Sequence, residues 1–205
     1  MESKLRSILL FGQPGVGKGT QGAILGEIPG FSHLATGDMF RGLDRDSELG
    51  KEFMKYSTQG LLVPDELTCR LWYQYVQGLI NTNKYNPTND VLVLDGIPRS
   101  LAQAKTLDEH VDVLGVIHLV CEDMEEVVQR MKRRAEIQNR PDDADEAVIR
   151  RRFEVYAKET QPVLGHYDAS VVHDVTAVGN PGDILLNILE KVIPAIKGHF
   201  GNPLG

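Results

Sequence analysis

The chain has 205 residues, of which 41% are hydrophobic and 25% charged, so it can bury one sizeable core and is neither disordered nor fibrous. Its net charge of -7 argues against a general nucleic-acid binder. It shows no apolar run long enough to cross a bilayer and no secretory signal pattern, so we expect a cytoplasmic protein without membrane partners. Because Cys69 and Cys121 are isolated from each other, we expect no structural zinc.

Short apolar runs alternate with longer amphipathic stretches along the chain. The runs are typical of strands buried on both faces and cover residues 7–11, 31–34, 91–94, 113–120 and 170–175. The amphipathic stretches indicate helices over residues 20–26, 65–82, 124–136, 145–167 and 181–197. This alternation predicts an α/β fold with a central parallel five-stranded sheet. Ligands are then expected beyond the carboxyl ends of the strands.

A glycine-rich loop follows the first predicted strand and precedes a helical stretch. Residues 12–20 read Gly-Gln-Pro-Gly-Val-Gly-Lys-Gly-Thr, which is close to the phosphate-binding loop pattern, although Gly19 separates Lys18 from Thr20. Glycines allow backbone N–H groups to turn towards phosphate oxygens, and the helix that follows presents its positive end to them. Lys18 supplies a mobile charge for the terminal phosphates. The loop therefore predicts a site for a nucleoside triphosphate.

Three further motifs follow this loop in order. They are Thr36-Gly37-Asp38-Met39-Phe40-Arg41, then Asp95-Gly96-Ile97-Pro98-Arg99, then Gln103. With these motifs and the Gly-Lys-Gly-Thr ending of the loop, residues 8–191 resemble the adenylate kinase family. The resemblance implies a P-loop NTPase-type three-layer fold and reversible, direct in-line phosphoryl transfer from ATP to AMP, giving two ADP, with Mg²⁺ as cofactor. The nucleotides ATP, AMP and ADP are its expected partners, and the chain is expected to act as a monomer.

The resemblance also implies how a single kinase domain over residues 1–205 is divided. The core is expected at residues 1–35, 80–130 and 144–197, with a helical NMP-binding insert at about 36–79 and a short lid at about 131–143. Few residues separate Arg134 from Arg140, which leaves no room for a long, zinc-binding lid. A lid serves to exclude water, which would otherwise accept the phosphoryl group in place of AMP.

Residue chemistry and resemblance together assign the site. Thr36 and Arg41 are expected to hold a base and a phosphate, and an amide such as that of Gln103 matches the edge of adenine. Asp95 ends an apolar run, where its carboxylate can face Mg²⁺ through water while Arg99 grips phosphate oxygens. The related UMP/CMP kinases usually have alanine at the position of Thr36 and asparagine near that of Gln103, so both positions favour AMP.

Arginines concentrate between residues 130 and 152 of this acidic chain. Fixed guanidinium groups stabilise the charge that spreads over a migrating phosphoryl group. By resemblance Arg130 stacks on the ATP base, while Arg134, Arg140 and Arg152 converge on phosphates. An insertion near Ala144 leaves Arg151 as an alternative to Arg152.

The expected site residues fall into four sets. The catalytic residues are Lys18, Arg99, Arg134, Arg140 and Arg152. The residues that bind ATP are Gly15, Val16, Gly17, Lys18, Gly19, Thr20, Arg130, Arg134 and Asn180. The residues that bind AMP are Thr36, Arg41, Val63, Gly96, Arg99, Gln103, Arg140 and Arg152. Asp95 holds Mg²⁺ through water. Two other functions remain open at this point, a kinase for UMP or CMP and a catalytically silent nucleotide sensor.

Overall fold

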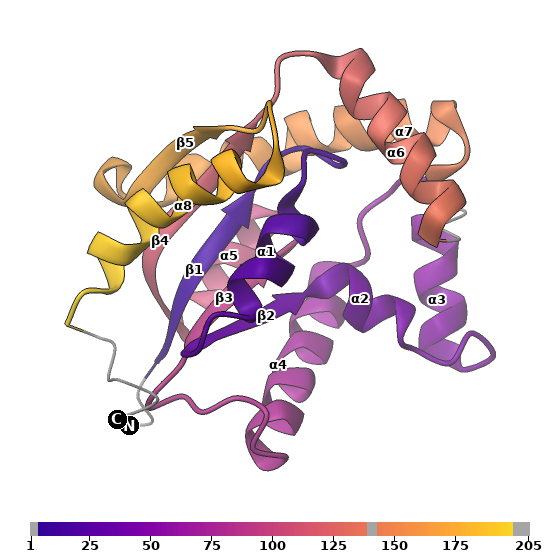
Figure 1. The fold of residues 1–205 in the computed structure, drawn as a ribbon. Coiled ribbons are helices and arrows are strands. Elements are labelled where there is room, and N and C mark those ends of the chain that lie inside the picture. Colours follow the sequence, from indigo (N-terminus) through magenta and orange to yellow (C-terminus); the bar gives the residue numbers. More distant parts are fainter. Residues whose placement is uncertain (1–3, 139–142, 199–205) are drawn as a thin grey trace.

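The computed structural model describes residues 4–138 and 143–198, and its centre is a twisted parallel sheet (Figure 1). Five strands form the sheet in the order β2-β3-β1-β4-β5. Their bounds are β1 Leu5–Phe11, β2 Phe31–Ala35, β3 Val91–Asp95, β4 Val111–Val120 and β5 Val172–Thr176. The order reverses around β1, which pairs with β3 on one side and β4 on the other. In such sheets ligands bind beyond the carboxyl ends of the strands, where the glycine-rich loop lies.

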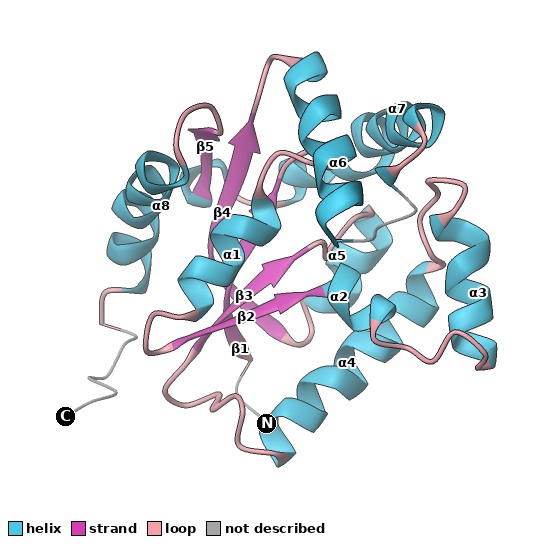
Figure 2. Ribbon diagram, turned by 45° about the vertical axis from the view of Figure 1, so that its right-hand side comes forward, coloured by secondary structure: helices cyan, strands magenta, loops and turns pink. Residues whose placement is uncertain are grey.

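Helices cover both faces of the sheet and make a three-layer fold (Figure 2). Their bounds are α1 Lys18–Gly26, α2 Thr36–Arg41, α3 Glu48–Ser57, α4 Asp65–Asn81, α5 Leu101–Leu107, α6 Met124–Gln138, α7 Glu146–Val155 and α8 Pro181–Ile196. The α1, α6, α7 and α8 helices contribute to one apolar cluster, and α2, α4 and α5 contribute to the other. The sequence prediction of the fold class is confirmed.

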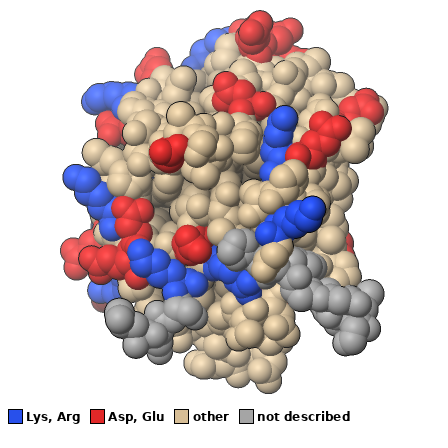
Figure 3. Space-filling model, turned by 90° about the vertical axis from the view of Figure 1, so that its left-hand side faces the viewer, with Lys and Arg blue, Asp and Glu red and all other residues tan. Residues whose placement is uncertain are grey.

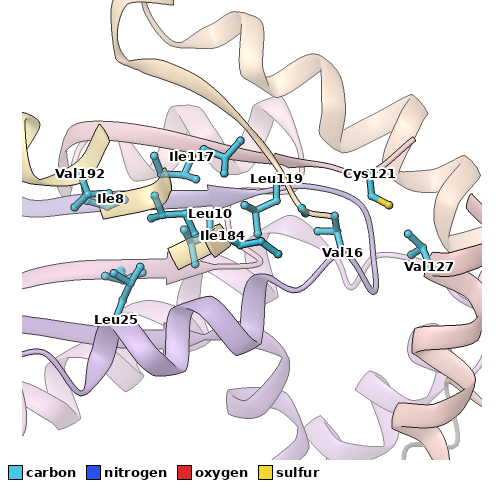
Figure 4. Packing of buried hydrophobic residues seen from close by; sticks show 14 of the residues in the cluster. Ile8, Leu10, Val16, Leu25, Ile117, Leu119, Cys121, Val127, Ile184 and Val192 are labelled. Carbon is cyan, nitrogen blue, oxygen red and sulfur yellow. The ribbon is translucent and has the colours of Figure 1, made fainter. Parts of the chain in front are cut away.

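The strands are buried on both faces because alternate side chains point into different clusters. Along β1, Ile8 and Leu10 belong to the first cluster, where they pack with Leu25, Ile184 and other residues (Figure 4). Leu9 and Phe11 belong to the second cluster. Successive strand residues point to opposite faces, so a strand between two helical layers must be apolar throughout. This explains why continuous apolar runs, and not alternating ones, marked the strands.

The helix predictions were incomplete. The α2, α3 and α5 helices were not predicted individually, although a helical insert was expected over about residues 36–79. The α2 and α5 helices have only 6 and 7 residues, too few to display a helical period clearly. Local start signals were nevertheless present, because Ser47 caps α3 and Ser100 caps α5 with their side-chain oxygens.

The predicted single helix over residues 145–167 was wrong. The α7 helix ends at Val155 and passes into a π-helical turn at Tyr156–Thr160 and a 3-10 helix at Gln161–His166. Pro162 has no N–H to donate and its ring clashes with the carbonyl four residues earlier, so the α-helical pattern cannot continue through it. A second 3-10 turn at Ala169–Val171 displaces the start of β5 to Val172.

The molecular surface carries charges of both signs. On the side that lies to the left in Figure 1, Lys and Arg side chains are interspersed with Asp and Glu (Figure 3). Within residues 4–138 and 143–198, the chain forms no helix long and apolar enough to span a bilayer.

Candidate active site

A cavity opens at the carboxyl edge of the sheet, between the glycine-rich loop and helices that come from both halves of the chain. Eight of the residues predicted for the site line it, namely Lys18, Thr36, Arg41, Val63, Gly96, Arg99, Gln103 and Arg152. They come from α1, α2, the loop before α4, the loop after β3, α5 and α7. The cavity therefore brings together all the described residues predicted for AMP and one predicted for ATP.

The glycine-rich loop has the backbone shape that a phosphate cradle needs. Gly15 and Gly17 adopt φ values of 82° and 114°, in the left-handed region that favours glycine. Val16 is buried in the core and anchors the middle of the loop (Figure 4), whereas Gly19 and Thr20 in the first turn of α1 are exposed. The loop thus holds its apolar residue inside and leaves the amino end of α1 open to a ligand.

Lys18 folds back over this loop. Its Nζ donates to the carbonyl oxygens of Gly12 at 2.6 Å and Gln13 at 3.0 Å. Burial lowers the pKa of Lys18 from 10.5 to about 8; Asp95 opposes this shift, and the charges of Arg99, Arg134 and Arg152 add to it. A phosphate group placed here would relieve the repulsion among these cations, so the site is electrostatically prepared for a polyanion.

Asp95 lies at the end of β3, beside the glycine-rich loop. A Cβ atom added to Gly19 would lie 3.5 Å from Asp95 Oδ2, which shows how close the carboxylate is to α1. The nearby His33 Nε2 is 4.0 Å from the same oxygen, and burial lowers the pKa of His33. Among the described residues no group of three or more His, Cys, Asp or Glu side chains is assembled for a metal. A single carboxylate beside a phosphate cradle fits Mg²⁺, which keeps several waters and binds mainly through substrate phosphates.

Thr36 and Gly96 form one wall of the cavity. The Thr36 hydroxyl donates to the Asp95 carbonyl oxygen at 2.7 Å, so its oxygen can only accept a hydrogen bond from a ligand. A Cβ atom on Gly96 would lie 2.7 Å from Thr36 Oγ1 and 2.8 Å from Arg99 Nη2. Since Gly96 also has a φ of 82°, only glycine lets the two side chains approach each other here.

Arg99 is fixed by contacts from two directions. Its Nε donates to the Gly96 carbonyl at 2.8 Å, and its own carbonyl accepts from the Thr160 hydroxyl at 2.9 Å. Thr160 and Tyr156, which both line the cavity, belong to the π-helical turn after α7 and were not predicted as site residues. Nothing local in the sequence marks that turn, although Pro162 indicates where regular helix must end.

Two arginines share one buried carboxylate. Asp143 is fully buried; its Oδ2 accepts from Arg134 Nε at 2.8 Å and its Oδ1 from Arg152 Nη1 at 2.5 Å. Arg152 lines the cavity, whereas Arg151 is exposed, so the structure brings Arg152 into the site. Arg140 lies outside the described residues.

The residues predicted for the ATP base lie away from this cavity. Arg130 Nη1 donates to the Ala177 carbonyl at 3.1 Å, and its Nη2 pairs with Glu126. Asn180 caps α8 by accepting from the backbone N–H groups of Gly182 and Asp183. Arg130 therefore reaches the loop that connects β5 to α8 and ends at Asn180. Arg130 and Asn180 thus mark one region, outside the cavity.

Comparisons with known proteins show which family this chain resembles. The model of the family described as adenylate kinase matches residues 10–172. An adenylate kinase of Thermobifida fusca is 39% identical over 198 residues, covering 94% of this chain and 98% of that protein. An adenylate kinase of Flavobacterium johnsoniae is 38% identical over 180 residues, covering 84% and 90%. An adenylate kinase of Thermus thermophilus is 37% identical over 190 residues, covering 89% and 95%.

Proposed function

This chain belongs to the adenylate kinase family, whose enzymes transfer a phosphoryl group reversibly from ATP to AMP to give two ADP, and we propose that the cavity described above is where it does so. The observation that carries the proposal is the convergence of Lys18, Arg99 and Arg152 on one cavity beside the phosphate-binding loop. Asp95 and Asp143 offset part of this charge, and a cavity lined by three cations favours a polyanionic ligand.

We propose that AMP lies between the α2 helix and the loop after β3. Arg41 and Arg99 hold its phosphate, Thr36 and Gln103 meet its base, and Val63 and Gly96 complete the walls around it. The donor phosphates lie on the N–H groups of Gly15, Val16, Gly17, Gly19 and Thr20. Arg130 and the backbone near Asn180 receive the donor base. The support is that the described acceptor residues line one cavity, while the residues proposed for the donor phosphates lie in the glycine-rich loop and the first turn of α1.

Transfer is direct in this proposal, without a covalent enzyme intermediate. Lys18 and Arg99 neutralise the phosphates from opposite sides, and Arg134, Arg140 and Arg152 stabilise the charge on the group in flight. Asp95 would hold Mg²⁺ through water, and the ion would supply positive charge to offset that of the donor phosphates. Because positioning and charge neutralisation suffice for such a reaction, no general base is required.

We also propose that residues 36–79 form a movable AMP-binding insert and residues 131–143 a short lid on a fixed core. The insert already lies close to the core, because a Cβ atom added to Gly60 would lie 3.0 Å from Arg152 Cγ. Hydrogen exchange measured with AMP alone should protect α2 to α4, and exchange with ATP alone should protect the end of α6. Uniform protection of the whole chain by either nucleotide would contradict the division.

We propose that the enzyme is a monomer and that it works in the cytoplasm. Light scattering at assay concentration and cell fractionation test these two statements.

The function is tested by ADP formation from Mg-ATP with AMP, UMP, CMP or GMP as acceptor. We expect turnover to be largely confined to AMP, because the Gln103 amide and the accepting Thr36 oxygen match the amino group and ring nitrogen of adenine. UMP and GMP present a carbonyl in that place, and CMP lacks the second ring of a purine. A preference for UMP or CMP would contradict the assignments of Thr36 and Gln103.

Neighbouring arginines provide a matched pair for the same assay. Arg152→Lys keeps the charge but loses the planar fork in the cavity, so we expect kcat/KM for AMP to fall by about 10²-fold. Arg151→Lys alters an exposed side chain, and we expect a change within about twofold. Equal effects at both positions would show that cavity lining does not identify the catalytic arginine.

A further inference from the structure

The amide of Gln103 is held at both of its polar atoms. Its Oε1 accepts from the Arg99 backbone N–H at 2.7 Å, and its Nε2 donates to Asp65 Oδ1 at 2.7 Å. Only 1% of Gln103 is exposed, although it lines the cavity. Asp65 opens α4 and lies 38 residues away from Gln103 in the sequence. The contact therefore joins the helical segment on one side of the cavity to α5 on the other.

These partners determine which end of the amide is nitrogen. A backbone N–H can only donate, so it must face the amide oxygen; an ionised carboxylate can only accept, so it must face the amide nitrogen. Flipping the amide end for end would place its N–H₂ group against the Arg99 backbone N–H and its oxygen against the Asp65 carboxylate. The bond to Asp65 is assisted by charge and is stronger than one between neutral groups. Asp65 thus opposes this reversal.

The fixed amide keeps a defined pattern for a ligand. Nε2 has a second hydrogen to donate and Oε1 has a second lone pair to accept with. The N1 edge of an amino purine, an exocyclic N–H₂ beside a ring nitrogen acceptor, matches oxygen to the amino group and nitrogen to the ring. On the same N1 edge an oxo purine has the reverse pattern, a carbonyl beside a ring N–H. A base in the same place would then need the reversed amide.

We propose that Asp65 is a positioning residue that sets acceptor specificity: by locking the Gln103 amide it selects an amino purine monophosphate over an oxo purine monophosphate. This inference rests on the proposed contact between Gln103 and the AMP base. Thr36 also favours an amino purine, because its hydroxyl donates its hydrogen to the Asp95 carbonyl and its oxygen can only accept one from the ligand. Selection by Asp65 needs no contact between the carboxylate and the nucleotide.

The test compares AMP with inosine monophosphate, a purine of the same size whose amino group is replaced by oxygen. The ratio of kcat/KM for the two acceptors is measured for the wild type, Asp65→Asn, and the matched control Glu66→Gln. Asp65→Asn keeps the shape but replaces the obligate acceptor with a group that can face either end of the amide. Glu66 is exposed in the same first turn of α4, so its variant loses the same charge at the same helix end.

We expect Asp65→Asn to lower the AMP preference about tenfold or more, the size of one lost charge-assisted hydrogen bond, and Glu66→Gln to leave it unchanged. Because both acceptors are measured on one variant, a general loss of folded protein cancels in the ratio. An unchanged ratio in Asp65→Asn would overturn the proposal.

Gln103→Ala separates this inference from the proposed function beneath it. If Gln103→Ala lowers the ratio but Asp65→Asn does not, Gln103 meets the base and only the lock is wrong. If neither variant lowers it, the lock is overturned together with the role of Gln103 in base recognition.

Discussion

Lys18→Met is expected to lower kcat/KM for Mg-ATP by about 10³-fold or more, while the ligand-free protein becomes more stable. The loss of activity follows from the position of Lys18, whose Nζ reaches into the phosphate-binding loop at Gly12. The gain in stability follows from removal of a buried charge. Desolvation, together with repulsion from Arg99 and Arg152, lowers the pKa of Lys18 to about 8 and so disfavours the charged side chain in the folded protein. Lys158→Met is the control, because that side chain is 83% exposed.

The direction of this pKa shift determines how the stability of the wild type changes with pH. The folded-state pKa of Lys18 lies below the unfolded value, so between about pH 8 and 10.5 the unfolded chain binds more protons. Below pH 8 the charged lysine opposes folding by at most about 3 kcal/mol. The real penalty is smaller than this, because the Lys18 residue is only partly buried and keeps contact with water. The penalty is relieved as pH rises.

Urea unfolding of the two proteins measures this effect directly. The excess stability of Lys18→Met over the wild type is therefore greatest near pH 7 and should shrink towards pH 10. An excess that is constant with pH would show that the buried charge is not its cause. ATP affinity of the wild type should fall over the same range, since the unliganded enzyme loses the proton that phosphate binding requires.

Asp143→Asn is expected to destabilise the ligand-free protein by about 3 kcal/mol, because it leaves two guanidinium groups without their shared carboxylate. The side chains of Arg134 and Arg152 are 28% and 20% exposed, so water compensates part of the loss and the effect lies at the lower end for a buried pair. Thermal or urea unfolding provides the measurement.

Glu146→Gln is a matched control for Asp143→Asn. Glu146 also pairs with two cations, Lys132 at 2.5 Å and Arg150 at 2.8 Å, but its side chain is 43% exposed. Its loss should change the free energy of unfolding much less than the loss of Asp143 does, because solvent screens these exposed pairs. If the two variants lose equal stability, the contribution of these ion pairs to the free energy of unfolding does not depend on burial of the carboxylate.

Nucleotides distinguish a functional from a purely structural role for this cluster. If Arg134 and Arg152 bind phosphates, Asp143 competes with the substrates for them. Adding Mg-ATP with AMP should then raise the melting temperature of Asp143→Asn more than that of the wild type, since the competitor is gone. Equal shifts would mean that the substrates do not take over these arginines.

The glycine-rich loop was predicted from sequence because its shape depends on adjacent residues. Glycine permits the left-handed backbone at Gly15 and Gly17, the apolar run before the loop makes β1, and Lys18 starts α1. Each of these properties is local, so a one-dimensional pattern contains it. The same reasoning located Thr36, Asp95 and Arg99 just after strands, because parallel strands bring their carboxyl ends to one edge.

Contacts between distant segments left no such pattern. Nothing in the sequence indicated that Asp143 would be buried between Arg134 and Arg152, since a lid carboxylate looks like any solvated acid before packing encloses it. The π-helical turn that carries Tyr156 and Thr160 was likewise missed, because an amphipathic pattern cannot distinguish it from a regular helix. Its place in the site appears in the folded structure, where Tyr156 and Thr160 line the cavity and Thr160 bonds to Arg99.

By itself, then, the sequence determined the strands, the phosphate loop and the kinds of charged group at the carboxyl edge of the sheet, because backbone preference and apolar periodicity act between near neighbours. Tertiary structure alone decided how those groups are oriented. Arg152 rather than Arg151 turns into the cavity, and Gln103 is held by Asp65 from 38 residues away. Orientation depends on partners that only folding brings within hydrogen-bonding distance, and the direction of each bond follows from which partner can donate and which can accept.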